Sequence, residues 1–331
     1  MRIATAAFAN PDPIDSATAK PVKGSENSFL DPSGRLIIGI ALCLARSAPH
    51  CTIRTHGRCA RVVGYTEVVK YEDRRMQSIE IHMFPCLRDN YGFLLHDEEA
   101  GVTAAVDTPE VQAILGALGE KNWKLTHILN THHHSDHAGG NIAIKEVTGC
   151  KIIGPRADAS RIPGIDVLVG EGDEFKLGDH PIKVFDTPGH TRGHIVYHLP
   201  EDQVAFVGDT LFAMGCGRLF EGTPTQMWTS LQKLMQWPDE TRVYCAHEYT
   251  QANARFALSV EPGNKMLSER AREVDALRAR DEPTIPTTIG MEKATNPFLR
   301  PMSPEIGAAV GAHDVDLTEV FARTRALKDV F

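Results

Sequence analysis

Metal-ligating side chains are concentrated in one short tract of the sequence, Thr131-His132-His133-His134-Ser135-Asp136-His137. The apolar residues 125–129 come directly before it, so the tract leaves a predicted strand while still extended. Alternate side chains of an extended chain point to one face, and His132 and His134 can therefore converge on one ion. Asp136 and His137 fall past the turn and cannot easily reach that ion, which favours a second ion beside the first. Imidazole and carboxylate ligands without thiolate suit Zn²⁺, Fe or Mn²⁺ and leave positions open for catalysis. The alternative is a surface histidine cluster that binds metal adventitiously.

Three other potential ligands stand on loops at the ends of predicted strands. His190 follows the alternating stretch 182–185, Asp209 follows an apolar run that ends at Val207, and His247 follows the run 243–245. A single histidine or aspartate in such a place is usually a turn or capping residue. Three of them, in a chain that already carries the tract, indicate further ligands of the same site.

The segments around these residues resemble a known family. The tract, DTPGHT at 186–191 and GDTLF at 208–212 are similar to segments of the metallo-β-lactamase superfamily. The resemblance narrows to glyoxalase II, the hydroxyacylglutathione hydrolases, on GCGRLFEG at 215–222, AHEYT at 246–250, VEPGN at 260–264 and RALKDVF at 325–331. The similarity runs from about Met76 to Phe331.

This resemblance implies a site for two divalent ions, with zinc foremost and iron or manganese as alternatives. It assigns His132, His134 and His190 to one ion, Asp136, His137 and His247 to the other, and Asp209 to both as a bridge. Even one Zn²⁺ can lower the pKa of a bound water to about 7, so a bridging hydroxide would be available near neutral pH. It would attack a glutathione thioester, foremost S-D-lactoylglutathione, and release D-lactate and glutathione in methylglyoxal detoxification. Because the pKa of a free thiol is about 8.5, the thiolate leaves without a strong general acid, and Asp136 and Asp209 are the expected catalytic carboxylates.

Substrate recognition should come from cations, because glutathione carries two carboxylates. Arg325 and Lys328 lie three residues apart, on one face of a predicted helix. The resemblance implies that they contact glutathione, and the alternative is a solvated helix face. It also implies substrate contacts from Arg218, Phe220, His247 and Tyr249. Arg218 stands where relatives often carry lysine, which keeps the charge. Phe220 stands where eukaryotic relatives carry a tyrosine that hydrogen-bonds the substrate, a contact that phenylalanine cannot make, although Tyr249 can still supply a hydroxyl.

The predicted elements fit an α+β fold. Strands over 79–84, 91–96, 102–106, 125–129 and 151–153 alternate with helices over 111–118 and 141–147, as in two packed sheets flanked by helices. The resemblance implies a metallo-β-lactamase-like αββα sandwich as the catalytic domain, residues 76–248. After Thr250 we expect strands to stop, and helices over 251–258, 268–280 and 317–328 to form a smaller substrate-binding domain, residues 249–331.

Composition limits the remaining functions. The 331 residues are 42% hydrophobic, enough for an ordinary core, and their formal net charge of -8 does not favour nucleic-acid binding. Seven scattered cysteines without a CxxC motif favour a reducing compartment. We expect a cytoplasmic monomer with a small-molecule substrate, bound to neither nucleic acid nor membrane. Residues 1–75, rich in Pro, Ser and Ala, should form a poorly ordered extension, added by a wrongly chosen start codon or serving in organellar targeting.

Two other functions stay open on the same scaffold. One is a glutathione persulfide dioxygenase, which would use one iron and O₂, and the other is a non-catalytic metal-binding protein. The C-terminal helical pattern and the complete set of ligands favour the hydrolase over both.

Overall fold

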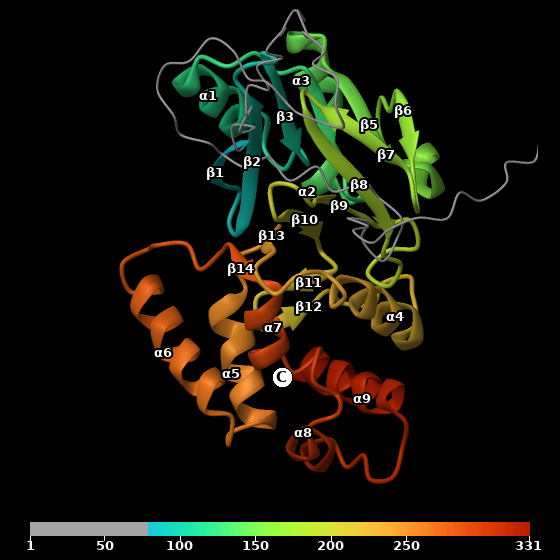
Figure 1. The fold of residues 1–331 in the computed structure, drawn as a ribbon, viewed down its shortest axis with the longest axis vertical. Helices are drawn as coiled ribbons and strands as arrows, with labels where there is room; N and C mark the ends of the chain where they lie inside the picture. Colours follow the sequence, from blue (N-terminus) through green and yellow to red (C-terminus); the bar gives the residue numbers. More distant parts are fainter. Residues whose placement is uncertain (1–78) are drawn as a thin grey trace, which may run out of the picture. The chain divides into compact units, whose positions relative to one another are not determined.

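The computed structural model describes residues 79–331, so the expectations for residues 1–75 lie outside the described residues. A mixed six-stranded sheet opens this region (Figure 1). Its strands lie in chain order: β1 (Glu80–Cys86), β2 (Asn90–Asp97), β3 (Val102–Val106), β4 (His127–Leu129), β5 (Lys151–Pro155) and β6 (Val167–Val169). The first three strands are antiparallel neighbours, and β3 to β6 run parallel. Parallel neighbours need crossover connections. These connections hold the helices α1 (Val111–Lys121), α2 (Ser135–Ala138) and α3 (Asn141–Thr148) and the 3₁₀ helix η1 (Arg156–Arg161).

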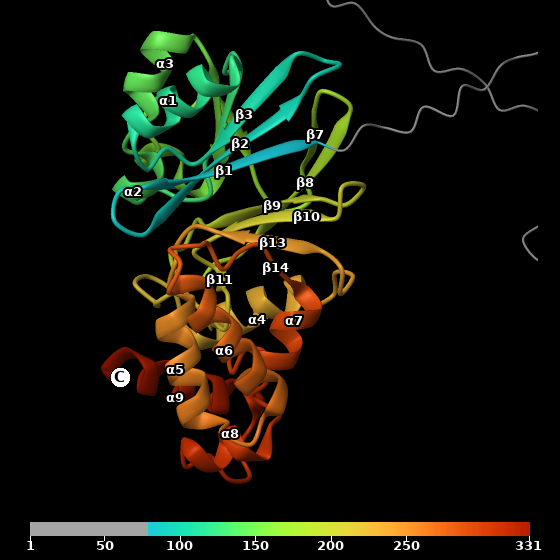
Figure 2. The ribbon, with the colours of Figure 1, turned by 90° about the vertical axis from the view of Figure 1, so that its left-hand side faces the viewer.

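A second six-stranded sheet packs against the first (Figure 2). Its order is β14 (Thr287–Thr288), β13 (Arg242–Cys245), β10 (Val204–Gly208), β9 (Ile195–Leu199), β8 (His180–Asp186) and β7 (Glu174–Leu177). A small hairpin, β11 (Leu211–Phe212) and β12 (Gly215–Cys216), and the helix α4 (Pro224–Leu234) lie between β10 and its parallel neighbour β13 in the chain. Helix α4 begins where it does because Thr223 and Gln226 form a capping box and Pro224 occupies its first turn.

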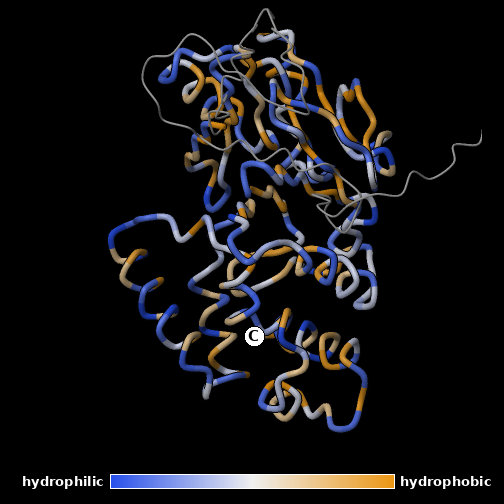
Figure 3. The backbone as a smooth tube through the Cα atoms, in the orientation of Figure 1, coloured by the Kyte–Doolittle hydropathy of each residue, from blue (hydrophilic) through white to orange (hydrophobic). Residues whose placement is uncertain are grey.

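Both faces of the first sheet are buried. Phe93 and Leu95 of β2 point into the core between the sheets, where Phe93 meets Phe206 at a ring-centroid distance of 5.4 Å. Leu94 points to the other face and packs in a cluster with Ile114 of α1 and Ile144 of α3. Because neighbouring side chains of a strand serve opposite faces, a strand covered on both sides is continuously apolar. The hydrophobic stretches in Figure 3 accordingly follow the strands. The expected α+β sandwich is confirmed.

Helices dominate the C-terminal part, as expected: α5 (Thr250–Val260), α6 (Lys265–Arg278), α7 (Ile289–Thr295), α8 (Pro304–Ala309) and α9 (Leu317–Val330). Two details differ from the sequence-based expectation. The short helices α7 and α8 were not expected, and the expectation that strands stop after Thr250 is wrong, because β14 pairs with β13 at the edge of the second sheet. A strand of two residues is too short to show an alternating pattern, and its pairing partner lies far away in sequence. Among residues 79–331, no helix is long and apolar enough to cross a membrane.

Candidate metal centre and substrate pocket

All seven expected metal ligands lie together, on segments that follow strand ends. The tract follows β4, with Asp136 and His137 on the short helix α2. His190 follows β8, Asp209 follows β10 and His247 follows β13. Strands β10 and β13 are parallel neighbours, so their carboxyl ends open at the same edge of the sheet. The two sheets meet at this edge, where Tyr91 N donates to Ala246 O at 2.8 Å.

The first group of ligands is formed by His132, His134 and His190. Their candidate ligand atoms all lie within 4.8 Å of one another. His132 Nε2 is 3.0 Å and His190 Nε2 is 3.1 Å from His134 Nδ1. His132 and His190 are buried, whereas His134 is partly exposed.

The second group is formed by Asp136, His137 and His247. Asp136 Oδ2 lies 3.6 Å from His137 Nε2 and 3.5 Å from His247 Nε2. Asp209 stands between the two groups: its Oδ1 is 3.4 Å from the Nε2 atoms of both His137 and His247, while its Oδ2 is 3.3 Å from His190 Nε2. One carboxylate oxygen thus faces each group, which is the arrangement that a bridging ligand requires.

The polar atoms of this centre are not satisfied by protein partners alone. His137 Nε2 and Asp209 Oδ1 are buried and have no hydrogen-bond partner among residues 79–331. Buried polar atoms are almost always paired, and these two point at the space that the second group of ligands encloses. The chemistry of the donors, five imidazoles and two carboxylates, fits divalent cations such as Zn²⁺.

Charges around the two groups differ. Burial opposes ionisation of Asp209, but His137, His247 and His190 together hold the pKa of its carboxyl far below the usual range. Burial lowers the pKa of His137, yet Asp209 and two further aspartates outweigh burial and raise it to about 9. Burial and the neighbouring histidines lower the pKa of His134 to about 4. The first group therefore presents neutral imidazoles, while the carboxylates around the second group favour positive charge there, carried either by a proton or by a bound cation.

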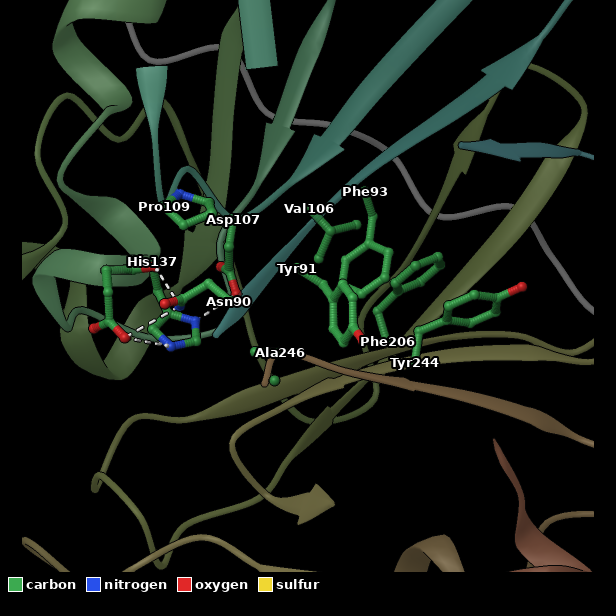
Figure 4. A pocket seen from close by; sticks show the side chains of 12 residues that line it. Asn90, Tyr91, Phe93, Val106, Asp107, Pro109, His137, Phe206, Tyr244 and Ala246 are labelled. Atoms are coloured by element: carbon green, nitrogen blue, oxygen red, sulfur yellow. Dashed lines mark hydrogen bonds and ion pairs between the residues drawn. The ribbon is translucent and has the colours of Figure 1, made fainter. Parts of the chain in front are cut away.

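A second layer of hydrogen bonds orients the ligands, and sequence reasoning missed it. Asp107, at the end of β3, accepts from His137 Nδ1 and Thr131 Oγ1 through Oδ2 and from Thr131 N through Oδ1, each at 2.8 Å. In the neutral form of His137, which is the form that binds a metal ion, the proton therefore sits on Nδ1 and the lone pair of Nε2 faces Asp209. Figure 4 shows His137 beside Asp107, with Tyr91 and Phe206 among the side chains that line the same small cavity. The strand-end position of Asp107 was a usable signal.

Three other ligands are held in the same way. His190 Nδ1 donates to Arg218 O at 2.9 Å, and His247 Nδ1 lies 2.9 Å from Asp89 Oδ1. The fully buried His194 accepts from Asp209 N through Nε2 at 3.0 Å. His194 follows His190 by four residues, and only its closeness to that ligand could have indicated its role.

A pocket of about 450 Å³ connects the metal centre with the C-terminal helix α9. His190 and Asp209 line one end, and Arg325 and Lys328 line the other. Arg325 does not lie on a solvated helix face: it is 4% exposed and donates to Cys216 O at 2.9 Å and to Asp329 Oδ1 at 3.0 Å. Burial, followed by repulsion from Arg325 and other cations, lowers the pKa of Lys328 to about 8.

Of the remaining expected substrate contacts, Arg218, Phe220 and Tyr249 also line this pocket, whereas His247 is not one of its lining residues. Arg218 is exposed at its mouth, with Nε 3.9 Å from Asp329 Oδ1. The exposed ring of Phe220 lies against His134 and His190, at centroid distances of 5.7 and 5.2 Å. Tyr249 stacks on His247 with centroids 4.7 Å apart. The structure thus brings the expected cations and aromatic rings together beside the ligands.

The fold and the centre define a class of protein. The family model described as the metallo-β-lactamase superfamily matches residues 97–247. The BLEG-1 B3 metallo-β-lactamase is 22% identical with a TM-score of 0.51, covering 67% of this chain and 100% of its own. A metallo-β-lactamase from Staphylococcus aureus subsp. aureus COL is 19% identical with a TM-score of 0.52, covering 76% of this chain and 71% of its own. These similarities support the metallo-β-lactamase fold.

The relatives narrow the class to a family. A model described as hydroxyacylglutathione hydrolase C-terminus matches residues 248–331. The hydroxyacylglutathione hydrolases of Maricaulis maris (strain MCS10) and Rhizobium meliloti (strain 1021) are 59% and 54% identical, each over 77% of this chain and all of their own length. That of Methylococcus capsulatus is 53% identical over 76% of this chain and 99% of its own length. The chain belongs to the hydroxyacylglutathione hydrolase family, and the resemblance inferred from the sequence is confirmed.

Proposed function

We propose that this protein hydrolyses glutathione thioesters, S-D-lactoylglutathione foremost, to the hydroxy acid and glutathione. The names of its relatives give the substrate class. The observation that carries the proposal for this chain is the single pocket that runs from His190 and Asp209 to Arg325 and Lys328. A thioester carbonyl can lie at the metal centre while a carboxylate of the same molecule reaches the cations.

The centre would hold two divalent ions, with zinc as the first candidate and iron or manganese as alternatives. His132, His134 and His190 would bind one ion, Asp136, His137 and His247 would bind the other, and Asp209 would bridge them. A bound divalent ion supplies Lewis acidity and lowers the pKa of a coordinated water toward neutrality. The two facing oxygens of Asp209 and the unpaired Nε2 of His137 support this assignment.

The side chains of the chain supply orientation and charge. Asn90 Nδ2 donates to Asp136 Oδ2 at 3.2 Å and so orients this carboxylate. The cations Arg325, Lys328 and Arg218 would bind glutathione carboxylates through charge-assisted hydrogen bonds. Phe220 can offer only apolar contact, so Tyr249 is the aromatic residue of the pocket with a hydroxyl to donate. The departing thiolate needs no strong acid, because its conjugate thiol is itself acidic.

Metal chemistry and glutathione binding are assigned to different parts of the chain. We assign the metal chemistry to a catalytic domain, residues 76–248, and the binding of the glutathione part to a helical domain, residues 249–331. A monomer suffices for this assignment, since one chain contributes both ends of the pocket. A cytoplasmic location agrees with the scattered cysteines, of which those at 86, 150, 216 and 245 are free.

The test is an assay on purified protein of defined metal content. We expect release of thiol from S-D-lactoylglutathione that depends on bound metal, and no O₂ consumption with glutathione persulfide. Metal-dependent O₂ uptake without thioester cleavage would replace the proposal with a persulfide dioxygenase. Metal binding with neither activity would make the protein a non-catalytic member.

A further inference from the structure

Two residues of the sequence motifs have no part in the proposed function so far. His133 lies between two ligands of the tract, and Glu221 lies in the GCGRLFEG segment. The structure brings both together with Asp158 and Arg161 of the 3₁₀ helix η1. We name these four residues the η1 cluster.

Arg161 is the centre of the η1 cluster. Its Nη2 donates to Asp158 Oδ1 at 2.5 Å and to Glu221 Oε2 at 3.0 Å, and its Nη1 donates to Glu221 Oε1 and to His133 Nε2, the latter at 3.1 Å. A guanidinium group can only donate, so His133 Nε2 accepts. The proton of His133 is then on Nδ1, which donates to Asp158 Oδ2 at 3.1 Å. The hydrogen bonds of the cluster therefore fit one arrangement of protons.

Glu221 joins the η1 cluster to the loops of the site. Its Oε2 also accepts from Arg192 N at 2.9 Å, two residues beyond the ligand His190. On either side of Glu221, Phe220 N donates to His190 O at 3.2 Å and Gly222 N donates to Gly189 O at 3.0 Å. The loop 217–223 is thus fastened along the loop 189–192.

Close packing supports this arrangement. Asp158 is 2% exposed, and a Cβ on Gly193 would lie 2.2 Å from its Cγ. A Cβ on Gly222 would lie 2.6 Å from Gly189 Cα. Such close approaches are possible only because Gly193 and Gly222 have no side chain. The loops and η1 therefore have little freedom to shift relative to one another. The hydrogen bond from Arg161 outweighs burial and lowers the pKa of Glu221 to about 2, which keeps the pair ionised at working pH.

We propose that Arg161 and Glu221 are positioning residues for catalysis: they fix the loop 217–223 against His190 and the tract. This loop carries Arg218 and Phe220 at the mouth of the pocket. The η1 cluster would therefore couple the placement of the substrate contacts to the placement of the first group of ligands. The substrate part of this inference rests on the proposed function, whereas the part on the ligands does not.

The test compares Arg161→Met and Glu221→Gln with a matched control, Arg156→Met. Arg156 begins the same 3₁₀ helix, but its Nη2 pairs with the exposed Asp173 at 2.7 Å, and among residues 79–331 none of its hydrogen bonds goes to the loop 189–192 or the loop 217–223. Two readouts are needed: kcat and KM for S-D-lactoylglutathione, and metal retention against a competing chelator. Loss of a residue that orients metal ligands costs about tenfold to a hundredfold in metal affinity or activity.

We expect both test variants to lose metal retention and kcat/KM in this range, with KM raised, and the double variant to be little worse than either single one. Arg161→Lys should recover only part of the loss, because lysine cannot make the paired contact with Glu221. The control should match the wild type. Variants that melt earlier but bind metal and substrate like the wild type would make the η1 cluster a purely structural ion pair and overturn the proposal.

The two readouts also separate this proposal from the proposed function. Should the wild type retain metal but cleave no thioester, the proposed function fails, and metal retention by the variants still decides the role of the η1 cluster. Should Arg161→Met fail to fold, Glu221→Gln and Arg161→Lys decide it in the same way.

Discussion

The substitution Asp107→Asn would test how the proton on His137 controls the metal centre. Asparagine has the shape of aspartate, and its Oδ1 can still accept from Thr131 N. Its Nδ2, however, would take the place of the oxygen that now accepts from His137 Nδ1 and Thr131 Oγ1. The hydroxyl of Thr131 can turn and accept a hydrogen bond from this amide, whereas the N–H group at Nδ1 of His137 would face another donor.

Two responses are open to His137, and both weaken metal binding. If the proton stays on Nδ1, a buried donor is left unpaired, at a cost of about 1–3 kcal/mol. If it moves to Nε2, the lone pair that faces Asp209 is lost. Residues that orient ligands typically contribute about tenfold to a hundredfold in metal affinity, or about 1.4–2.8 kcal/mol at 1.4 kcal/mol per factor of ten. The two estimates agree, so we expect a loss of this size.

The measurement is metal retention against a chelator, together with thermal unfolding of the metal-free protein. The matched control is Asp97→Asn. Asp97 is 7% exposed, compared with 5% for Asp107, and accepts from two backbone amides, of Ala100 and Asp179, at 3.0 and 3.1 Å. We expect the control to lower the unfolding temperature without changing metal retention. Wild-type retention in Asp107→Asn would refute the argument from the proton on His137.

Four further predictions concern the bridge, the two cations, the pH dependence and the N-terminal segment. Asp209→Ala should lose one metal and the hydrolysis, because two ions would then repel each other without a shared ligand; metal analysis showing two ions per chain with near-native turnover would contradict the bridge. Replacing Arg325 and Lys328 by alanine should raise KM strongly at unchanged metal content, since each charge-assisted bond contributes about 1.5–3 kcal/mol. An unchanged KM would show that neither side chain binds the substrate. Because the pKa of Lys328 is about 8, this cation is present below pH 8 and lost above it. We therefore expect kcat/KM to fall as pH rises through 8 in the wild type but not in Lys328→Arg. The same fall in both proteins would exclude Lys328 as its cause. A chain that starts at Met76 should keep its metal and its activity, since all the assigned site residues lie within 79–331, and misfolding of this shorter chain would show that the segment before Met76 belongs to the fold.

That the seven expected ligands lie together could be predicted from the sequence, because each follows a strand that the sequence reveals. Alternation and apolar runs mark the ends of β8, β10 and β13, and the tract itself contains four of the seven ligands. The hydrogen bonds that orient them could not be predicted in the same way. Asp107 reaches His137 because β3 and β4 pair in one sheet, and Asp89, in the turn between β1 and β2, reaches His247 only because the two sheets pack together. The strand-end rule found Asp209, and it would have found Asp107 had it been applied to β3.

The side of α9 that faces the pocket was likewise undetermined by the sequence. Spacing places Arg325 and Lys328 on one helix face, but a face that meets solvent and a face that meets a pocket have the same spacing. Tertiary contacts decide between them: Phe321 of α9 packs on Trp228 of α4 at a centroid distance of 5.9 Å, and Arg325 then reaches Cys216 O of β12. These contacts hold α9 beside the hairpin β11–β12. A chain with a net charge of -8 therefore has a local cluster of cations that line the same pocket as two of its expected metal ligands. Attraction of an anionic substrate by this protein is therefore a property of the placement of α9 and not of its overall charge.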